Sequence, residues 1–246
     1  MRKRVKIFVP IPMDEAGVAN RASQLSVEQV RDGYDVEFVA VSWGAALGDS
    51  YYDTMLMDMS VFEAGLKAEE EGFDAVCIDT VSDSGLYALR SRLSIPVFGP
   101  GQAALHGACM LGHKFSIITM WDEWFHLYTK ILSEYKLEAR CASIRSIKTR
   151  PDLEDLLEGK EEVIFKKLEQ ESLAAIEEDG ASVIVLGSTT MHQSHAYLEE
   201  VLPVPVINPG LLCYKFCEVF LELGLSHSKA AFPSPEIPND DGILNR

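Results

Sequence analysis

The sequence predicts an α/β fold of two pseudo-symmetric lobes, each a parallel sheet flanked by helices. Short runs rich in Val and Ile alternate with longer amphipathic segments along the 246 residues, which is typical of strand–helix alternation. Several of the short runs lack polar alternation, as expected for parallel strands that are buried on both faces. The same strand–helix pattern occurs twice, so we expect two similar halves.

Strands are expected where residues of high β propensity cluster, and helices where apolar residues recur every three or four positions. Eight segments fit strands, and these are residues 4–10, 35–41, 74–79, 95–98, 114–119, 143–147, 182–187 and 204–207. Six segments fit helices, and these are residues 18–32, 55–71, 101–111, 123–135, 161–178 and 210–223. Gly112 and Gly224 each follow a helical segment and are suited to end it.

The internal repeat sets the expected lobe boundaries. Residues 72–80 read Gly-Phe-Asp-Ala-Val-Cys-Ile-Asp-Thr, and residues 180–188 read Gly-Ala-Ser-Val-Ile-Val-Leu-Gly-Ser. Each copy is a buried strand, a polar turn, a helix, a second strand that contains Pro-Val, and a further helix. We therefore expect lobe 1 to comprise residues 1–98 and 208–246, and lobe 2 to comprise residues 99–207.

A hydroxyl-rich turn follows the buried strand in both copies of the repeat. Residues 79–84 read Asp-Thr-Val-Ser-Asp-Ser, and residues 187–192 read Gly-Ser-Thr-Thr-Met-His. Ligands of open α/β sheets bind beyond the carboxyl ends of the strands. The two equivalent turns therefore predict an active site in the cleft between the lobes, with one turn on each side of the ligand.

Composition excludes several classes of function. The formal net charge of −16 argues against a nucleic-acid partner and against a polybasic membrane surface. No apolar run approaches the roughly 20 residues that a membrane-spanning helix needs. The five scattered cysteines are typical of reduced thiols in a cytoplasmic protein. We expect no metal and no cofactor, because zinc spacing, a phosphate-binding loop and a dinucleotide fingerprint are all missing from the sequence.

Several segments resemble one enzyme family. Residues 95–108 read Ile-Pro-Val-Phe-Gly-Pro-Gly-Gln-Ala-Ala-Leu-His-Gly-Ala, and residues 114–119, 137–145 and 223–229 fit the same pattern. Over about residues 4–235, the chain resembles the hydantoin racemase branch of the aspartate/glutamate racemase superfamily. The resemblance implies a homo-oligomer, two α/β lobes and a cofactor-free site between them. It also implies one cysteine in each strand-end turn, one removing the α-proton and the other delivering a proton to the opposite face.

The chain departs from this family pattern at both turns. The first turn would read Ala-Cys-Phe, but residues 79–81 are Asp-Thr-Val. The second would read Gly-Cys-Ala-Gly-Met, but residues 187–191 are Gly-Ser-Thr-Thr-Met. An Asn-Pro-Asn near the start is replaced by Pro-Ile-Pro at residues 10–12. A thiol has a pKa of about 8.5, whereas a hydroxyl is a far weaker acid, so the exchange counts against two-cysteine racemisation.

Four residues are candidate catalytic groups: Thr80, Ser188, Asp79 and His192. Thr80 and Ser188 stand where the family has its cysteines, and they could bind the ligand, stabilise an enolate-like charge or cap the turns. Asp79 could be a buried acid or base, or a turn-forming residue. His192 could be a general base, a carboxylate ligand or a surface histidine; with His195 and Asp79 it could also share a metal.

Further residues are candidate substrate contacts. Thr119 ends a predicted strand and resembles the family's pocket threonine. Trp121 could cover the ligand or join a hydrophobic cluster with Trp124 and Phe125. The full set is Pro12, Val81, Ser82, Thr119, Trp121, Thr189 and Thr190.

The sequence favours a cofactor-independent enzyme acting next to a carboxylate or carbonyl of a small polar metabolite. We expect a small carboxylate or a cyclic amide or lactone as substrate, and isomerase, epimerase or lyase chemistry through an enolate-like intermediate. One alternative is a hydrolase that uses an activated Ser188 or water. Another is a protein that binds a small carboxylate without catalysis, because loss of both cysteines is also what decay of an enzyme would produce.

Overall fold

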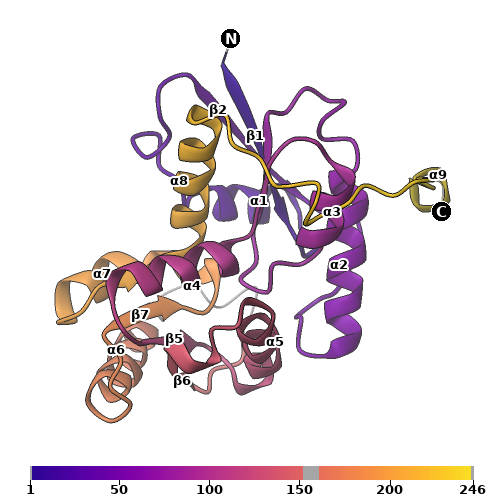
Figure 1. The fold of residues 1–246 in the computed structure, drawn as a ribbon. Coiled ribbons are helices and arrows are strands. Elements are labelled where there is room, and N and C mark those ends of the chain that lie inside the picture. Colours follow the sequence, from indigo (N-terminus) through magenta and orange to yellow (C-terminus); the bar gives the residue numbers. More distant parts are fainter. Residues whose placement is uncertain (1, 152–160, 245–246) are drawn as a thin grey trace. The chain divides into compact units, whose positions relative to one another are not determined.

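The computed structural model describes residues 2–151 and 161–244, which form two compact units (Figure 1). Lobe 1 comprises Met1–Gly99 and Cys213–Arg246, and lobe 2 comprises Pro100–Leu212. The boundaries expected from the sequence, after residues 98 and 207, differ slightly from this division. Among the described residues, no helix combines the length and the apolar character needed to cross a bilayer.

Lobe 1 is built on a four-stranded parallel sheet in the order β2-β1-β3-β4. Its strands are β1 (Lys3–Val9), β2 (Tyr34–Ala40), β3 (Ala75–Ile78) and β4 (Val97–Phe98). Its helices are α1 (Glu15–Ala22), α2 (Tyr51–Gly65), α3 (Leu86–Arg92) and, near the C-terminus, α9 (Asp241–Leu244).

Lobe 2 repeats this plan with a parallel sheet in the order β6-β5-β7-β8. Its strands are β5 (Phe115–Thr119), β6 (Cys141–Ser146), β7 (Val183–Leu186) and β8 (Val206–Ile207). Its α-helices are α4 (Pro100–Leu111), α5 (Phe125–Tyr135), α6 (Glu161–Glu177) and α7 (His195–Val201). Short 3₁₀ helices are η1 (Asp122–Trp124), η2 (Glu138–Arg140) and η3 (Thr189–Ser194). Helix α8 (Pro209–Glu222) begins in lobe 2 and ends in lobe 1.

The two sheets confirm the predicted fold class. The first four strands and the last four have the same order and the same parallel pairing, so β3 and β7 hold equivalent positions. Every residue of β3 and of β7 is buried, which explains why both sequences are continuous apolar runs. The turns that follow β3 and β7 are therefore the corresponding strand ends of the two lobes.

Two helices differ from the segments expected from the sequence. A helix was expected over residues 18–32, but α1 covers Glu15–Ala22. It ends there because the hydroxyl of Ser23 donates to the carbonyl of Asn20, an alternative to continued helix that serine often supplies. Helix α2 was expected over residues 55–71 but covers Tyr51–Gly65, because the Ser50 side chain caps it by accepting from the Asp53 backbone N–H.

The segment that follows α8 is fixed to lobe 1 by polar contacts. The Lys229 ammonium donates to three backbone carbonyls at the end of α3, those of Arg90, Ser91 and Leu93. Nε2 of His227 lies 3.2 Å from the Val97 backbone nitrogen and 3.2 Å from the Ile95 carbonyl oxygen. The first contact uses an unprotonated Nε2 as acceptor, and the second uses a protonated Nε2 as donor. Burial and the nearby Arg90 guanidinium lower the pKa of His227 from 6.5 to about 4.

This pKa predicts a pH-dependent stability of the protein. Unfolded chain binds a proton at His227 near pH 6.5, but folded chain binds it only near pH 4, so stability falls as pH decreases across that window. His227→Gln removes the titrating group and keeps an acceptor for Val97. We expect its melting temperature to fall less steeply than that of wild type between pH 6.5 and 4. The exposed control His113→Gln should keep the wild-type slope, and an unchanged slope in His227→Gln would contradict the assignment.

Candidate active site at the two strand ends

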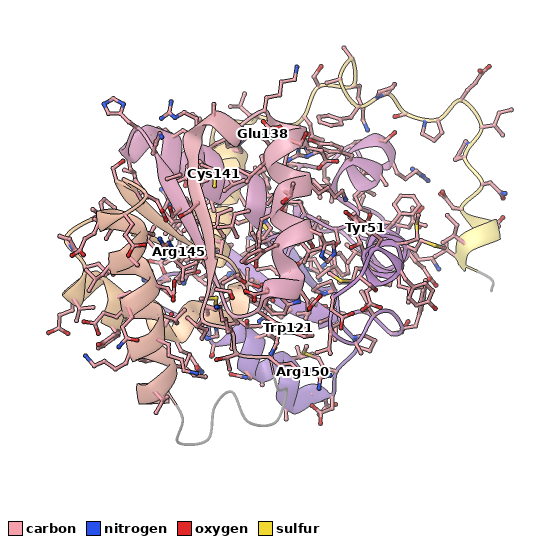
Figure 2. All side chains as sticks on the ribbon, turned by 90° about the horizontal axis from the view of Figure 1, so that it is seen from below. Tyr51, Trp121, Glu138, Cys141, Arg145 and Arg150 are labelled. Carbon is pink, nitrogen blue, oxygen red and sulfur yellow. The ribbon has the colours of Figure 1, made fainter. Side chains whose placement is uncertain are left out.

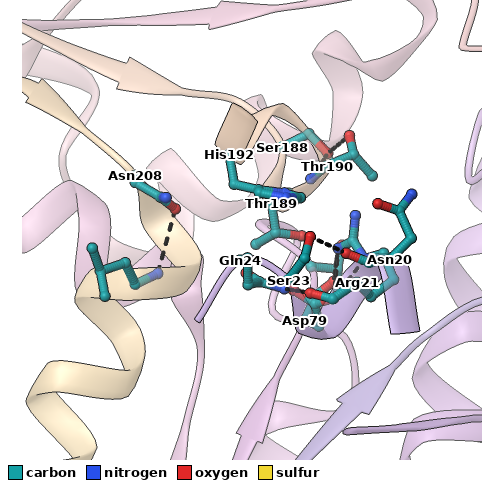
Figure 3. A network of polar contacts seen from close by, with 12 residues as sticks. Asn20, Arg21, Ser23, Gln24, Asp79, Ser188, Thr189, Thr190, His192 and Asn208 are labelled. Carbon is teal, nitrogen blue, oxygen red and sulfur yellow. Dashed lines mark hydrogen bonds and ion pairs between the residues drawn. The ribbon is translucent and has the colours of Figure 1, made fainter. Parts of the chain in front are cut away.

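Asp79 follows β3 and is held in a buried ion pair with Arg21 of α1. One carboxylate oxygen accepts from Nε of Arg21 at 2.8 Å and from its terminal nitrogen at 2.6 Å. The other oxygen accepts from Nε2 of Gln24 at 3.1 Å. The Asp79 side chain is 1% exposed and that of Arg21 is 8% exposed. Figure 3 shows Arg21 and Gln24 beside Asp79, so the carboxylate is fixed from two directions.

Arg21 and Gln24 are the site residues that sequence reasoning missed. They lie 58 and 55 residues before Asp79 in the chain, and no motif links them. A weak signal was available, because Arg21 is a basic residue in the first helical segment that the sequence predicts after the first strand. The pairing also changes the interpretation of Asp79, because both of its carboxylate oxygens already accept hydrogen bonds from buried side chains.

Three hydroxyls form a row in the turn after β3. The Thr80 and Ser82 oxygens are 3.0 Å apart, and the Ser82 and Ser84 oxygens are also 3.0 Å apart. Thr80 is half-buried, whereas Ser82 and Ser84 are 3% and 0% exposed. The row therefore runs from a half-buried residue to fully buried ones in lobe 1. Val81 is also buried, which leaves its side chain little surface for a ligand.

Close packing maintains the shape of this turn. Asp83 has a positive φ of 54°, a conformation that an aspartate adopts more easily than most residues. A Cβ at Gly99 would lie 2.3 Å from a carboxylate oxygen of Asp83, so only glycine fits beside it. Pro12 is half-buried in the loop after β1, whose carboxyl end lies at the same edge of the parallel sheet.

In lobe 2, Tyr128 of α5 connects the ends of β5 and β7. Its hydroxyl donates to the backbone carbonyl of Gly187 at 2.7 Å and lies 2.7 Å from the hydroxyl of Thr119. Since a phenol has one proton, Thr119 must donate to Tyr128. A Cβ at Gly187 would come within 2.8 Å of the Tyr128 hydroxyl, so glycine is required there. Thr119 is 0% exposed, and its hydroxyl bonds to Tyr128 and so helps to hold the end of β5 in place.

The turn after β7 contains a second hydroxyl pair. The Ser188 and Thr190 oxygens are 2.7 Å apart, and the Ser188 oxygen also accepts from the Thr190 backbone N–H at 3.2 Å (Figure 3). Both residues are half-buried, while Thr189 is buried. Ser188 thus caps η3, as one sequence interpretation proposed, and it still carries a hydroxyl at the strand end.

His192 is oriented by the same turn. Its Nδ1 lies 3.1 Å from the backbone carbonyl of Thr189, and a carbonyl can only accept, so Nδ1 carries the proton. In the neutral imidazole, Nε2 then holds the lone pair that a general base needs. His195 is used differently, because its Nε2 lies 3.1 Å from the carbonyl of Val206 and its Nδ1 lies 3.6 Å from Glu199.

Among the described residues, His, Cys, Asp and Glu side chains form no group of three or more placed to hold a metal ion. All five cysteines are free, and none lies in either strand-end turn. Cys77 is buried inside β3, where contacts with Cys213 and Cys217 and burial raise its pKa well above the usual range. Burial also raises the pKa of Cys141 on β6 to about 11. Because neither turn contains a cysteine, neither strand end carries a thiol.

Trp121 packs into the hydrophobic cluster of lobe 2. It is half-buried against the core together with Trp124, and the Arg150 guanidinium lies 5.8 Å from the centre of its ring. Figure 2 labels Trp121 and Arg150, together with Cys141 and Arg145 on β6. Arg145 forms ion pairs with Glu178 and Asp179, which follow the end of α6.

Comparisons with known proteins agree with this architecture. The family model for Asp/Glu/Hydantoin racemase matches residues 18–215. The hydantoin racemase of Pseudomonas sp. (strain NS671) is 36% identical over 197 residues, which cover 79% of this chain and 78% of that protein. The hydantoin racemase of Rhizobium meliloti is 32% identical over 164 residues, 66% of each chain.

Solved structures show the same fold. The allantoin racemase of Klebsiella pneumoniae superimposes with a TM-score of 0.87 at 26% identity, covering 98% of both chains. An arylmalonate decarboxylase superimposes with a TM-score of 0.63 at 17% identity, covering 90% of this chain and 94% of the other, which shows a likeness of fold alone. With a family model that matches most of its length, and with the lobe plan described above, the chain belongs to the Asp/Glu/Hydantoin racemase family.

Proposed function

We propose that the protein is a cofactor-independent enzyme that acts at a carbon next to a carbonyl or carboxylate and proceeds through an enolate-like intermediate. The observation that carries the proposal is the pair of bonded hydroxyls at each strand end, Thr80 with Ser82 and Ser188 with Thr190. Removing a proton from such a carbon places negative charge on the neighbouring oxygen. Fixed O–H groups aimed at that oxygen stabilise the charge without reorganisation.

His192 is the proposed proton-transferring group. A hydroxyl works as a base only when a partner removes its own proton, so Thr80 and Ser188 are better suited to donate hydrogen bonds. The carbonyl of Thr189 holds His192 in the tautomer with the lone pair on Nε2. A histidine in this state can accept a carbon-bound proton and return it near neutral pH.

The relatives favour isomerase or epimerase chemistry. The similar enzymes are hydantoin racemases and allantoin racemases, whose names identify substrates that are cyclic amides with a proton-bearing carbon beside a carbonyl. We propose a substrate of this class. A lyase reaction would use the same charge stabilisation and differs in losing a group other than a proton. We further propose a reducing cytoplasmic location, which suits five free cysteines, and a homo-oligomer, as the family resemblance implies.

The proposal gives Asp79 a positioning role instead of proton transfer. Its carboxylate oxygens already accept three hydrogen bonds from Arg21 and Gln24, and it is buried. Its negative charge is therefore used to fix α1 against the end of β3. Val81, Thr119 and Thr189, whose side chains are buried, likewise support the turns, while Pro12 and Trp121 remain proposed substrate contacts.

Thr80→Ala and Ser188→Ala test the proposed donors. Removal of one oxyanion-stabilising donor typically lowers kcat by about 100-fold or more, so we expect each variant to lose activity by that order while keeping its fold. Racemisation of optically active substituted hydantoins and of allantoin is followed by polarimetry. The matched control is Thr129→Ala, which removes a hydroxyl bonded within α5. Wild-type turnover in both Thr80→Ala and Ser188→Ala would contradict the proposal.

Asp79→Ala tests the positioning role. The substitution leaves the Arg21 guanidinium buried without its counter-charge, and we expect a loss of about 3–5 kcal/mol in the free energy of unfolding, measured with urea. Asp35→Ala breaks the exposed ion pair with Arg2 and should cost less than about 1 kcal/mol. If Asp79→Ala kept its stability but lost turnover, Asp79 would instead take part in proton transfer.

A further inference from the structure

The hydroxyl row of lobe 1, formed by Thr80, Ser82 and Ser84, has one more hydroxyl proton than the hydrogen bonds within the row require. Three hydroxyls, those of Thr80, Ser82 and Ser84, share two contacts of 3.0 Å each. Each contact uses one proton, so one O–H is left over. In the described part of the chain, these three hydroxyls have no other hydrogen-bond partner. The position of the remaining proton depends on the direction in which the row donates.

Burial decides that direction. If Thr80 donated inward to Ser82 and Ser82 to Ser84, the remaining O–H would belong to Ser84, which is 0% exposed and has no acceptor among the described residues. A buried donor without an acceptor costs roughly 1–3 kcal/mol. If Thr80 and Ser84 both donated to Ser82, the remaining O–H would belong to Ser82, which is 3% exposed, and the same cost would arise. The outward direction avoids this cost, because Ser84 donates to Ser82 and Ser82 donates to Thr80. The remaining proton is then on Thr80, the half-buried member of the row.

Lobe 2 shows the same surplus of one proton. Ser188 and Thr190 share one hydroxyl contact of 2.7 Å, so one of their two O–H groups is left over. The Ser188 oxygen already accepts from the backbone N–H of Thr190. Both side chains are half-buried, so the remaining donor lies on an accessible residue whichever way the pair is arranged. Each strand end therefore has one hydroxyl whose proton is free to be donated to a ligand.

We infer that Ser82, supported by Ser84, is a positioning residue that fixes Thr80 as a hydrogen-bond donor to a carbonyl or carboxylate oxygen of the ligand. This deepens the proposed function, on which it rests for the identity of the ligand. It differs from the sequence-based expectation that Ser82 itself contacts the substrate, because Ser82 is 3% exposed and its hydroxyl lies 3.0 Å from that of Thr80. A fixed donor at Thr80 favours binding of ligands with strong oxygen acceptors over binding of ligands with weak acceptors.

The test compares binding of hydantoin with binding of dithiohydantoin, in which both carbonyl oxygens are replaced by sulfur, a weaker acceptor. Calorimetry on the intact protein gives the ratio of the two Kd values. We expect wild type to prefer hydantoin at least tenfold. Thr80→Val removes the donor at nearly constant shape, and Ser82→Ala removes its support, so each variant should lose most of this preference. Ser82→Thr keeps a hydroxyl and should retain it.

A double variant separates positioning from direct contact. If Ser82 acts only through Thr80, Thr80→Val combined with Ser82→Ala has the same ratio as Thr80→Val alone. A further additive loss in the double variant would show that Ser82 contacts the ligand itself and would overturn the inference. Ser60→Ala, which removes another buried hydroxyl of lobe 1, is the control and should keep the wild-type ratio.

The outcomes also separate this inference from the proposed function. No preference of wild type for hydantoin at millimolar concentrations, or an intact preference in Ser82→Ala, overturns the assignment of Thr80 as a fixed donor. If wild type prefers hydantoin and the variants lose this preference, but wild type turns over no hydantoin, the assignment of Thr80 as a donor is supported. The proposed reaction is then contradicted instead.

Discussion

A buried polar group must find a hydrogen-bond partner, and this constraint fixes both strand ends on which the site depends. In lobe 1 the charge of Asp79 is neutralised by Arg21, which joins α1 to the end of β3. In lobe 2 the Tyr128 hydroxyl joins the ends of β5 and β7 through Thr119 and the Gly187 carbonyl. Thr80 and Ser188 directly follow Asp79 and Gly187, the two residues that these contacts hold in place. Rigid placement is what allows a weak donor such as a hydroxyl to stabilise a developing charge.

The absence of thiols in the turns changes the chemistry that the family's architecture can support. Two thiols can exchange roles as acid and base, because a thiol titrates within reach of neutral pH. Two hydroxyls cannot, and each of them here is bonded to a second hydroxyl two residues later. In the proposed mechanism, proton transfer is separated from charge stabilisation. It is assigned to His192, whose Nδ1 lies 3.1 Å from the Thr189 carbonyl oxygen. Under the proposed function, each copy of the sequence repeat supplies one hydrogen-bond donor at its strand end.

Much of the fold was predictable because it depends on local patterns. The buried runs at β3 and β7 and the repeated Pro-Val strands indicated two parallel sheets, and the structure confirms them. The location of the turns followed from the same patterns. The ion pair of Arg21 with Asp79 was not predictable, because its partners are 58 residues apart and no spacing rule connects them. The end of α1 was wrong for a related reason, since Ser23 bonds backward to Asn20 where periodicity alone favoured a longer helix. The direction in which the hydroxyl row donates was inferred from the exposed fractions of Ser82 and Ser84, which the sequence does not give.

Hydrogen–deuterium exchange is the most direct test of carbon-acid chemistry without cysteine. The two protons on the ring carbon of hydantoin next to its carbonyl are followed by proton NMR in deuterium oxide with the purified protein. The account predicts that wild type replaces these protons by deuterium and that His192→Gln does so at least about 100-fold more slowly, the order expected for loss of a general base. Binding of hydantoin without exchange in wild type, or equal exchange rates in the two proteins, would contradict it.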